Sequence, residues 1–307
     1  MTLFFSRRTY NASKKRFTNN PADVTRYVQL TSGPDASGKW QGGIISKDDW
    51  LAQVKAEATT NEITIYVHGF NTDQIDNLGR MNKIRAGLRG EGYRGALIAY
   101  DWPSAGTVTA YDSDKRHAKL TAEHLVRDGI LPLLALSPRP KVNLIAHSMG
   151  AYLVLRALSE FDDDAGPGSG AWKLNETMFV SGDADRRWFG KGAWGALLLA
   201  HRSKRFTNYY SQLDDVLNAA VPANGFRKRA GRSGMPSGIH KNHVDLYSHE
   251  QYLKDVDGPN RTVLNSHRWW FDNAKFYRDA GLTLAGQPAF PLPTRRRTTT
   301  TDLALLS

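Results

Sequence analysis

Ser148 lies where an apolar run gives way to an amphipathic helical pattern. Residues 143–158 read NLIAHSMGAYLVLRAL, so a short buried strand ends just before Ser148 and a helix follows it. A sharp strand-to-helix turn lifts a serine hydroxyl above a sheet, and the small residues Ala146 and Gly150 let strand and helix pass closely. The helix N-terminus then places partial positive charge beside a developing oxyanion. The pattern predicts a nucleophilic serine rather than an inert helix-capping serine, with alanine replacing the first glycine of G-x-S-x-G.

A second polar loop follows an earlier apolar run. Residues 62–67 (EITIYV) predict a buried strand, and the chain continues directly into HGFN. An oxyanion hole takes one amide from the residue after the nucleophile, here Met149, and a second from the loop after an earlier strand. His68 followed by Gly69 fits that loop. An ordinary turn with glycine at positive φ is the simpler alternative, but the elbow downstream favours the oxyanion loop.

Strands and helices alternate from residue 62 onward. Helical patterns cover residues 150–161 and 116–136, and Pro132 must end or kink the second of these helices. Alternation of this kind predicts the α/β class, with a mostly parallel sheet and helices on both of its faces. The further strands that we predict span residues 95–100, 141–146, 176–181 and 205–210.

Five segments together resemble a known family. VHGFN, DWPSAG (101–106), AHSMGAYLVLRAL, SGDADRRWF (181–189) and YYSQLDDVL (209–217) occur in this order within residues 60–280, and FFSRR (4–8) belongs with them. The chain resembles a bacterial family of largely uncharacterised α/β hydrolases near the lipases and esterases. The resemblance implies a triad of Ser148, Asp214 and His267, with the amides of Phe70 and Met149 as oxyanion donors. The order Ser…Asp…His agrees with this fold independently.

Position in the sequence does not by itself decide which aspartate is the acid of the triad. Asp214 and Asp215 follow one predicted strand, while Asp183 and Asp185 follow the strand before it. The resemblance favours Asp214, and two arginines directly after Asp185 are able to pair with the earlier carboxylates. The simpler alternative is that Asp214 only caps the helix that begins near Val216.

The base is chosen from four C-terminal histidines. His267 precedes the aromatic-rich WWFDNAKFY, which is able to anchor a catalytic loop against the core, so we favour His267 over His249 and His243. The segment IHKNHVDLYSH also permits a metal site in which His240, Asp245 and His249 converge. A solvated loop is the favoured interpretation, so we predict no metal and no cofactor.

Composition narrows the class of protein. The chain has 307 residues, a 40% hydrophobic fraction and no cysteine, which excludes disulfides and thiolate chemistry. No run approaches the ~20 apolar residues of a membrane-spanning helix, and no signal peptide is evident, so we expect a soluble, cytoplasmic protein. The net charge of +11 favours a solvated basic surface, with at most weak association with an anionic membrane. No zinc-finger, RNP or zipper pattern accompanies the charge, so we expect no nucleic-acid partner.

The expected organisation is one catalytic domain with two flanking segments. We predict an N-terminal extension packing on the core over residues 1–60, an α/β-hydrolase domain over 61–285 and a mobile tail over 286–307. Residues 188–206 form either a lid or acyl-pocket wall, or a core helix with an exposed C-terminus. The expected function is cleavage of a small-molecule carboxylic ester through an acyl-enzyme. The alternatives are a thioesterase or phospholipase acting on anionic substrates, and a non-catalytic binding protein on the same fold.

Overall fold

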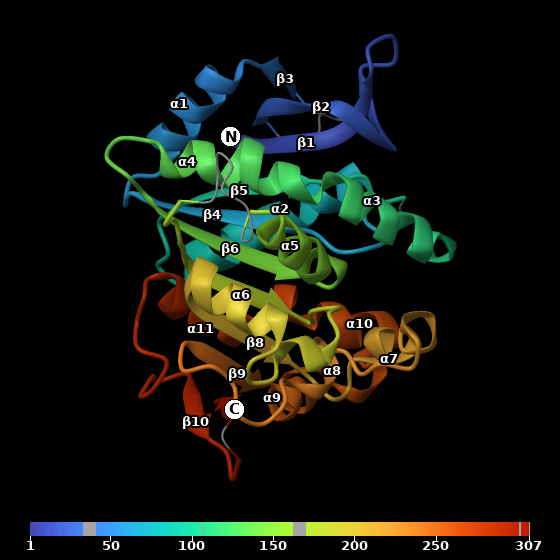
Figure 1. The fold of residues 1–307 in the computed structure, drawn as a ribbon, viewed down its shortest axis with the longest axis vertical. Coiled ribbons are helices and arrows are strands. Elements are labelled where there is room, and N and C mark those ends of the chain that lie inside the picture. Colours follow the sequence, from blue (N-terminus) through green and yellow to red (C-terminus); the bar gives the residue numbers. More distant parts are fainter. Residues whose placement is uncertain (33–40, 106, 162–169, 301, 307) are drawn as a thin grey trace.

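The strands predicted from apolar runs lie in the middle of an 11-stranded sheet in the computed structural model of the chain (Figure 1). The structure describes residues 1–32, 41–105, 107–161, 170–300 and 302–306. The spatial order of the strands is β10-β11-β9-β8-β7-β6-β4-β5-β1-β2-β3. Their bounds are β1 Thr2–Asn11, β2 Arg16–Ser32, β3 Gln41–Ile45, β4 Glu62–Val67, β5 Ala96–Asp101, β6 Lys141–His147, β7 Leu174–Val180, β8 Ser203–Tyr210, β9 His243–Tyr247, β10 Arg295–Arg297 and β11 Leu303–Leu305.

The sheet is parallel except at its two ends. Every neighbouring pair from β1 through β5, β4, β6, β7, β8 and β9 to β11 is parallel. The antiparallel pairs are β1 with β2, β2 with β3, and β10 with β11. The predicted α/β class with a mostly parallel sheet is therefore confirmed. Because parallel strands end at the same edge, the loops after β4, β6 and β8 come together there.

Helices cover both faces of the sheet, and each face has its own hydrophobic core. One core is built from alternate strand residues with α1 (Lys47–Glu57), α3 (Tyr111–His124), α5 (Met149–Ser159) and α6 (Trp194–Arg202). The other core uses the opposite strand face with α2 (Gln74–Gly90), α9 (His249–Asp255), η6 (Trp269–Asp272) and α11 (Ala274–Leu284). The alternation follows from the period of two along a strand, so that Leu144 and Ile145 enter different cores.

The N-terminal segment is integrated into the sheet. β1 pairs with β5 from Leu3↔Ile98 to Ser6↔Asp101, and β2 and β3 extend the same end of the sheet. Figure 1 shows these strands at one end of the sheet, beside α1. The expectation of an extension that packs on the core therefore understates its part, because the first strand completes the row of parallel strands.

The C-terminal segment also differs from the expected loose tail. Residues 295–297 and 303–305 form β10 and β11, and β11 pairs in parallel with β9 at the far end of the sheet (Figure 1). Arg295 is buried and binds Asp279 of α11 at 2.8 Å. An arginine run that looks like a solvated tail in the sequence thus contributes one buried ion pair.

Two helical predictions are refined by the structure. Pro132 does not end the helical segment, because a π-helical stretch, η2 (Leu125–Ile130), lies between α3 and α4 (Leu131–Leu134) and puts Pro132 in the first turn of α4. A proline is tolerated in the first turn of a helix because the amide hydrogen that it lacks would have no acceptor within that helix. Within residues 188–206, Leu198 and Leu199 of α6 are buried in a core, so this segment provides a core helix rather than a lid.

Candidate active site

Ser148 occupies a strained turn between β6 and α5. Its backbone has φ 53° and ψ −125°, values that a residue with a side chain adopts only under constraint. Hydrogen bonds fix the turn, since the Ser148 amide donates to the Val180 carbonyl at 3.2 Å and the Ser148 carbonyl accepts from the Asp183 amide at 2.8 Å. The turn has the geometry of a nucleophile elbow.

Close approaches on both sides of Ser148 explain the small residues around it. A Cβ placed on Gly69 would lie 2.7 Å from the Cβ of Ser148, so the loop after β4 runs directly against the serine. A Cβ on Gly150 would lie 2.6 Å from the Val67 carbonyl oxygen, so α5 begins in contact with the end of β4. Ala146 is fully buried, and its single methyl is accommodated where a first glycine is usual.

The two amides predicted as oxyanion donors are without a hydrogen-bond acceptor among the described residues. Met149 is the first residue of α5, so its amide has no partner within the helix. Phe70 lies in the loop that contacts Ser148, and its amide likewise donates to no described group. Unsatisfied amides beside a serine are what an oxyanion hole requires.

Asp214 and His267 are in direct contact. The carboxylate Oδ2 of Asp214 lies 2.7 Å from Nδ1 of His267, and both side chains are buried. Asp214 caps α7 (Asp215–Ala219), and His267 lies in α10 (Val263–Arg268). The amide of Asp215 also donates to Ser266 Oγ at 3.0 Å, so the neighbours of Asp214 and His267 in the chain provide a second link between the two helices.

His147 connects this pair to the serine turn. Its Nε2 lies 3.1 Å from the carbonyl oxygen of His267, and the two imidazole rings are 4.6 Å apart. Because a carbonyl only accepts, His147 carries its proton on Nε2. Burial, with smaller effects from the charges of His267 and Arg80, holds the pKa of His147 well below its usual range. A neutral His147, the residue directly before Ser148, therefore supports the His267 backbone, a contact that the sequence did not indicate.

The competing carboxylates have other partners. Asp183 is buried and binds Arg229 at 2.6 Å, and it also accepts a hydrogen bond from the Tyr111 hydroxyl at 2.6 Å. Asp185 caps a short 3₁₀ helix and pairs with Arg187 at 2.9 Å. Asp215 is exposed on α7. Of the four acids weighed from the sequence, only Asp214 contacts a histidine.

The remaining C-terminal histidines have no carboxylate partner among the described residues. His243 is buried in β9 against Phe206, and burial lowers its pKa to about 4. His249 begins α9 and stacks on Tyr247. Asp245 accepts from Asn208 and from the Met235 amide, away from His240 and His249. Within the part of the chain that the structure describes, no group of three or more potential ligands is arranged to hold a metal ion.

A parallel sheet with helices on both faces and a strained serine turn between β6 and α5 is the architecture of an α/β hydrolase. A family model described as "Alpha/beta hydrolase of unknown function (DUF900)" matches residues 45–241. The chain therefore belongs to this family of α/β hydrolases. The matched residues include the predicted oxyanion loop, Ser148 and Asp214, while His267 lies beyond them.

One curated relative matches a short stretch of the chain. The "Uncharacterized protein alr1448" of Nostoc sp. is 36% identical over 70 residues, which are 23% of this chain and 18% of that protein. The match thus spans less than a fifth of the length of the relative.

Two solved structures illustrate the more distant similarity. A cutinase-like protein from Cryptococcus sp. is 12% identical with a TM-score of 0.40, and the match covers 76% of this chain and 98% of that one. The RedJ thioesterase of Streptomyces coelicolor is 13% identical with a TM-score of 0.30, and the match covers 81% and 82% of the two chains.

A helix that crosses a bilayer needs about 20 predominantly apolar residues. In the described ranges, no helix is at once long and apolar enough to cross a membrane.

Proposed function

We propose that the protein is a serine hydrolase that cleaves carboxylic esters through an acyl-enzyme. Ser148 is the nucleophile, His267 the general base and Asp214 the acid that orients it, and the amides of Phe70 and Met149 bind the oxyanion. The observation that carries the proposal is the buried 2.7 Å contact between Asp214 and His267, whose backbone carbonyl binds His147, the residue before a serine held at positive φ.

The proposed chemistry follows from the direction of that contact. With Nδ1–H donated to Asp214, the Nε2 lone pair of His267 is free to accept the proton of Ser148. Serine Oγ bonds to the ester carbonyl carbon, and the carbonyl electrons move to an oxygen bound by the two amides. The ester C–O bond then breaks as His267 returns the proton to the departing alcohol.

Deacylation repeats these steps with water. His267 takes a proton from the water, the hydroxide attacks the acyl carbon, and Ser148 leaves with the proton returned from His267. The products are a carboxylic acid and an alcohol. Because water is the only co-substrate, the balance of the reaction requires no cofactor.

A fluorophosphonate probe tests the proposal. The wild type should be labelled at Ser148, and the Ser148→Ala variant should remain unlabelled. Hydrolysis of a short aryl ester should fall by on the order of 10⁴-fold or more in the variant, because removal of a triad member leaves only binding and the oxyanion hole. Mass spectrometry of the labelled peptide is the measurement, and a label on another serine would contradict the assignment.

A further inference from the structure

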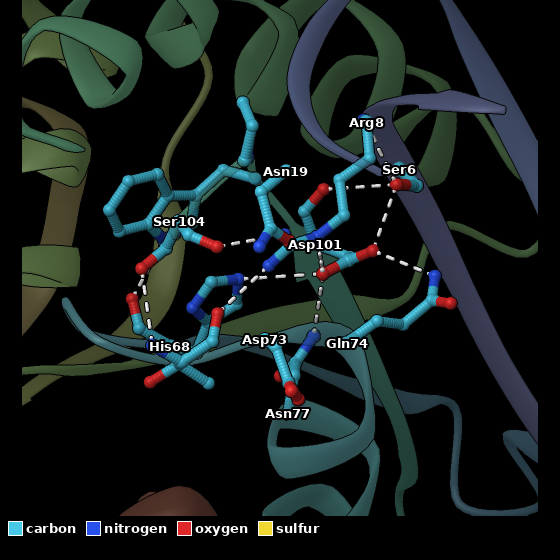
Figure 2. Close-up of polar contacts among 12 residues, drawn as sticks. Ser6, Arg8, Asn19, His68, Asp73, Gln74, Asn77, Asp101 and Ser104 are labelled. Atoms are coloured by element: carbon cyan, nitrogen blue, oxygen red, sulfur yellow. Dashed lines mark hydrogen bonds and ion pairs between the residues drawn. The ribbon is translucent and has the colours of Figure 1, made fainter. Parts of the chain in front are cut away.

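A buried polar cluster lies behind the loop that contacts Ser148. Arg8 of β1 and Asp101 at the end of β5 are both fully buried, and the Arg8 Nε lies 2.8 Å from a carboxylate oxygen of Asp101. Figure 2 shows the two side chains at the centre of the cluster, with residues of the loop after β4 and of the start of α2 around them. The triad and the oxyanion amides do not account for this cluster.

Besides Arg8, three side chains donate hydrogen bonds to the carboxylate of Asp101. Ser6 Oγ donates to it at 2.9 Å, Gln74 Nε2 at 3.1 Å and Asn77 Nδ2 at 3.2 Å. Burial alone would raise the pKa of Asp101, but Arg8 and the adjacent His68 hold it below its usual range. The carboxylate is therefore ionised and fixed, and so it fixes the guanidinium of Arg8.

The rest of the Arg8 guanidinium binds two backbone carbonyls and one side chain. Its Nη2 donates to the Thr72 carbonyl at 2.9 Å, and its Nη1 donates to the Ser104 carbonyl at 3.0 Å and to Asn19 Oδ1 at 2.6 Å. The Thr72 amide in turn donates to Ser104 Oγ at 3.2 Å. Both backbone groups of Thr72 are thus held by the cluster.

The other end of the loop is held as well. Trp102 Nε1 donates to the His68 carbonyl at 2.8 Å, and the indole stacks on the His68 ring with 5.0 Å between centroids. Residues 68 and 72 are therefore both tied to the segment after β5. Between them lies Phe70, whose amide has no acceptor among the described residues.

We propose that Arg8, fixed by Asp101, is a positioning residue that clamps residues 68–72 so that the Phe70 amide points at the oxyanion. The inference rests on the proposed function of Ser148 and the oxyanion hole. A preorganised donor stabilises a transition state because it needs no rearrangement when charge develops. A displacement of about 1 Å in a catalytic group costs on the order of 10²-fold in rate. The clamp also gives a role to the FFSRR and DWPSAG segments, which contain Arg8, Asp101 and Ser104.

A second buried arginine–aspartate pair provides a control that distinguishes an effect on the loop from a general effect on stability. Arg295 and Asp279 are equally buried and 2.8 Å apart, but Arg295 lies in β10, at the opposite end of the sheet from β1, and Asp279 lies in α11. Replacing a buried arginine by lysine keeps the charge and removes the planar set of donors. Arg8→Lys and Arg295→Lys should therefore disturb folding in similar ways, and only the first should release Thr72.

The experiment compares the rate of fluorophosphonate labelling at Ser148 in the full chain. Arg8→Lys and Ser104→Ala should each lower the second-order rate constant on the order of 10- to 100-fold per folded molecule. Arg295→Lys should be labelled at a rate within about threefold of the wild-type rate, even if its melting temperature falls as far as that of Arg8→Lys. Labelling of both Arg8→Lys and Ser104→Ala at the wild-type rate would overturn the clamp. An unlabelled wild type would instead contradict the proposed function.

Hydrogen exchange supplies a readout that does not depend on activity. The amides of residues 68–72 should exchange at least about tenfold faster in Arg8→Lys than in the wild type, with no such change in Arg295→Lys. Equal exchange of this segment in the three proteins would overturn the clamp, whatever the labelling shows. Faster exchange of the segment in both lysine variants would also overturn it, because the effect would then be general loss of stability.

Discussion

The two carboxylate oxygens of Asp214 serve two different partners. Oδ1 accepts from the Leu217 amide at 2.9 Å and so caps α7, while Oδ2 contacts His267 at 2.7 Å. From the sequence, capping and catalysis stood as alternatives for this residue. The geometry makes them compatible, because the cap holds the carboxylate in the orientation that the histidine needs.

Replacement of Asp214 by asparagine separates the two roles. Asparagine is also a good N-cap, so Asp214→Asn should fold with little loss of stability. Its amide neither stabilises an imidazolium nor enforces the tautomer that leaves Nε2 free, so kcat should fall by roughly 10⁴-fold. Aryl-ester turnover and thermal melting of purified protein measure the two effects. Asp215→Asn, an exposed neighbour on the same helix, is the control and should keep its activity.

Near-normal turnover by a folded Asp214→Asn protein would move the acid elsewhere. Asp183 is then the next residue to test, since its amide already binds the Ser148 carbonyl.

The assignment of His267 makes a separate prediction. His267→Ala should lose nearly as much turnover as Ser148→Ala, because the two side chains act as one unit. His249→Ala should retain most activity, since His249 begins α9 and has no carboxylate partner among the described residues. Initial rates with a short aryl ester, normalised to folded protein, distinguish the two. An inactive His249→Ala together with an active His267→Ala would reject the assigned base.

The residues of the site differ in how far the sequence reveals them. The turn at Ser148 could be predicted because its strand, turn and helix are contiguous in the sequence. Asp214 and His267 needed the family resemblance, since their contact spans 53 residues and several other pairs fit the same order. Arg8 and Asp101 meet across 93 residues only because β1 pairs with β5. No local pattern encodes that register.

The same contrast holds for the secondary-structure elements. β4, for example, is buried along its whole length, and its mostly apolar sequence EITIYV predicts a strand. β3 at the edge of the sheet has no buried residue, and β2 beside it is only partly buried. Edge strands of this kind carry polar residues and glycine, which resemble a loop in the sequence. The segment IHKNHVDLYSH favours a solvated loop in the sequence, although its residues His243–Tyr247 form β9.

The C-terminal strand hairpin predicts an asymmetry between adjacent arginines. Arg295 is buried with Asp279, so Arg295→Gln leaves an uncompensated carboxylate and should cost on the order of 3–5 kcal/mol of unfolding free energy. Arg296 pairs with Glu250 at the surface, so Arg296→Gln should cost less than about 1 kcal/mol. Urea unfolding measures both. Equal and small losses would mean that the hairpin contributes little to stability.

At the scale of the whole molecule, two buried carboxyl groups make the folded protein less stable as the pH rises toward neutrality. Burial raises the pKa of Glu176 in β7 to about 7, although Arg205 binds it at 2.7 Å. Burial also raises the pKa of Asp245 in β9 to about 7, against the donors Asn208 and the Met235 amide and with help from the charge of Asp302. Both groups hold a proton in the folded protein at a pH where the unfolded chain has released it.

The stability of the Asp245→Asn variant should increase relative to that of the wild type as the pH rises. Between about pH 4 and 7 the folded protein binds more protons than the unfolded chain, so the contribution of Asp245 to stability falls with rising pH and levels off above its folded pKa. Asparagine stays neutral, so its hydrogen-bonding cost is the same at every pH. The melting temperature of the variant minus that of the wild type should rise by a few degrees from pH 5 to pH 8, and Glu176 cancels in that difference. A difference that is flat across this range would show that Asp245 is ionised throughout, and a difference that falls would contradict a raised pKa of Asp245.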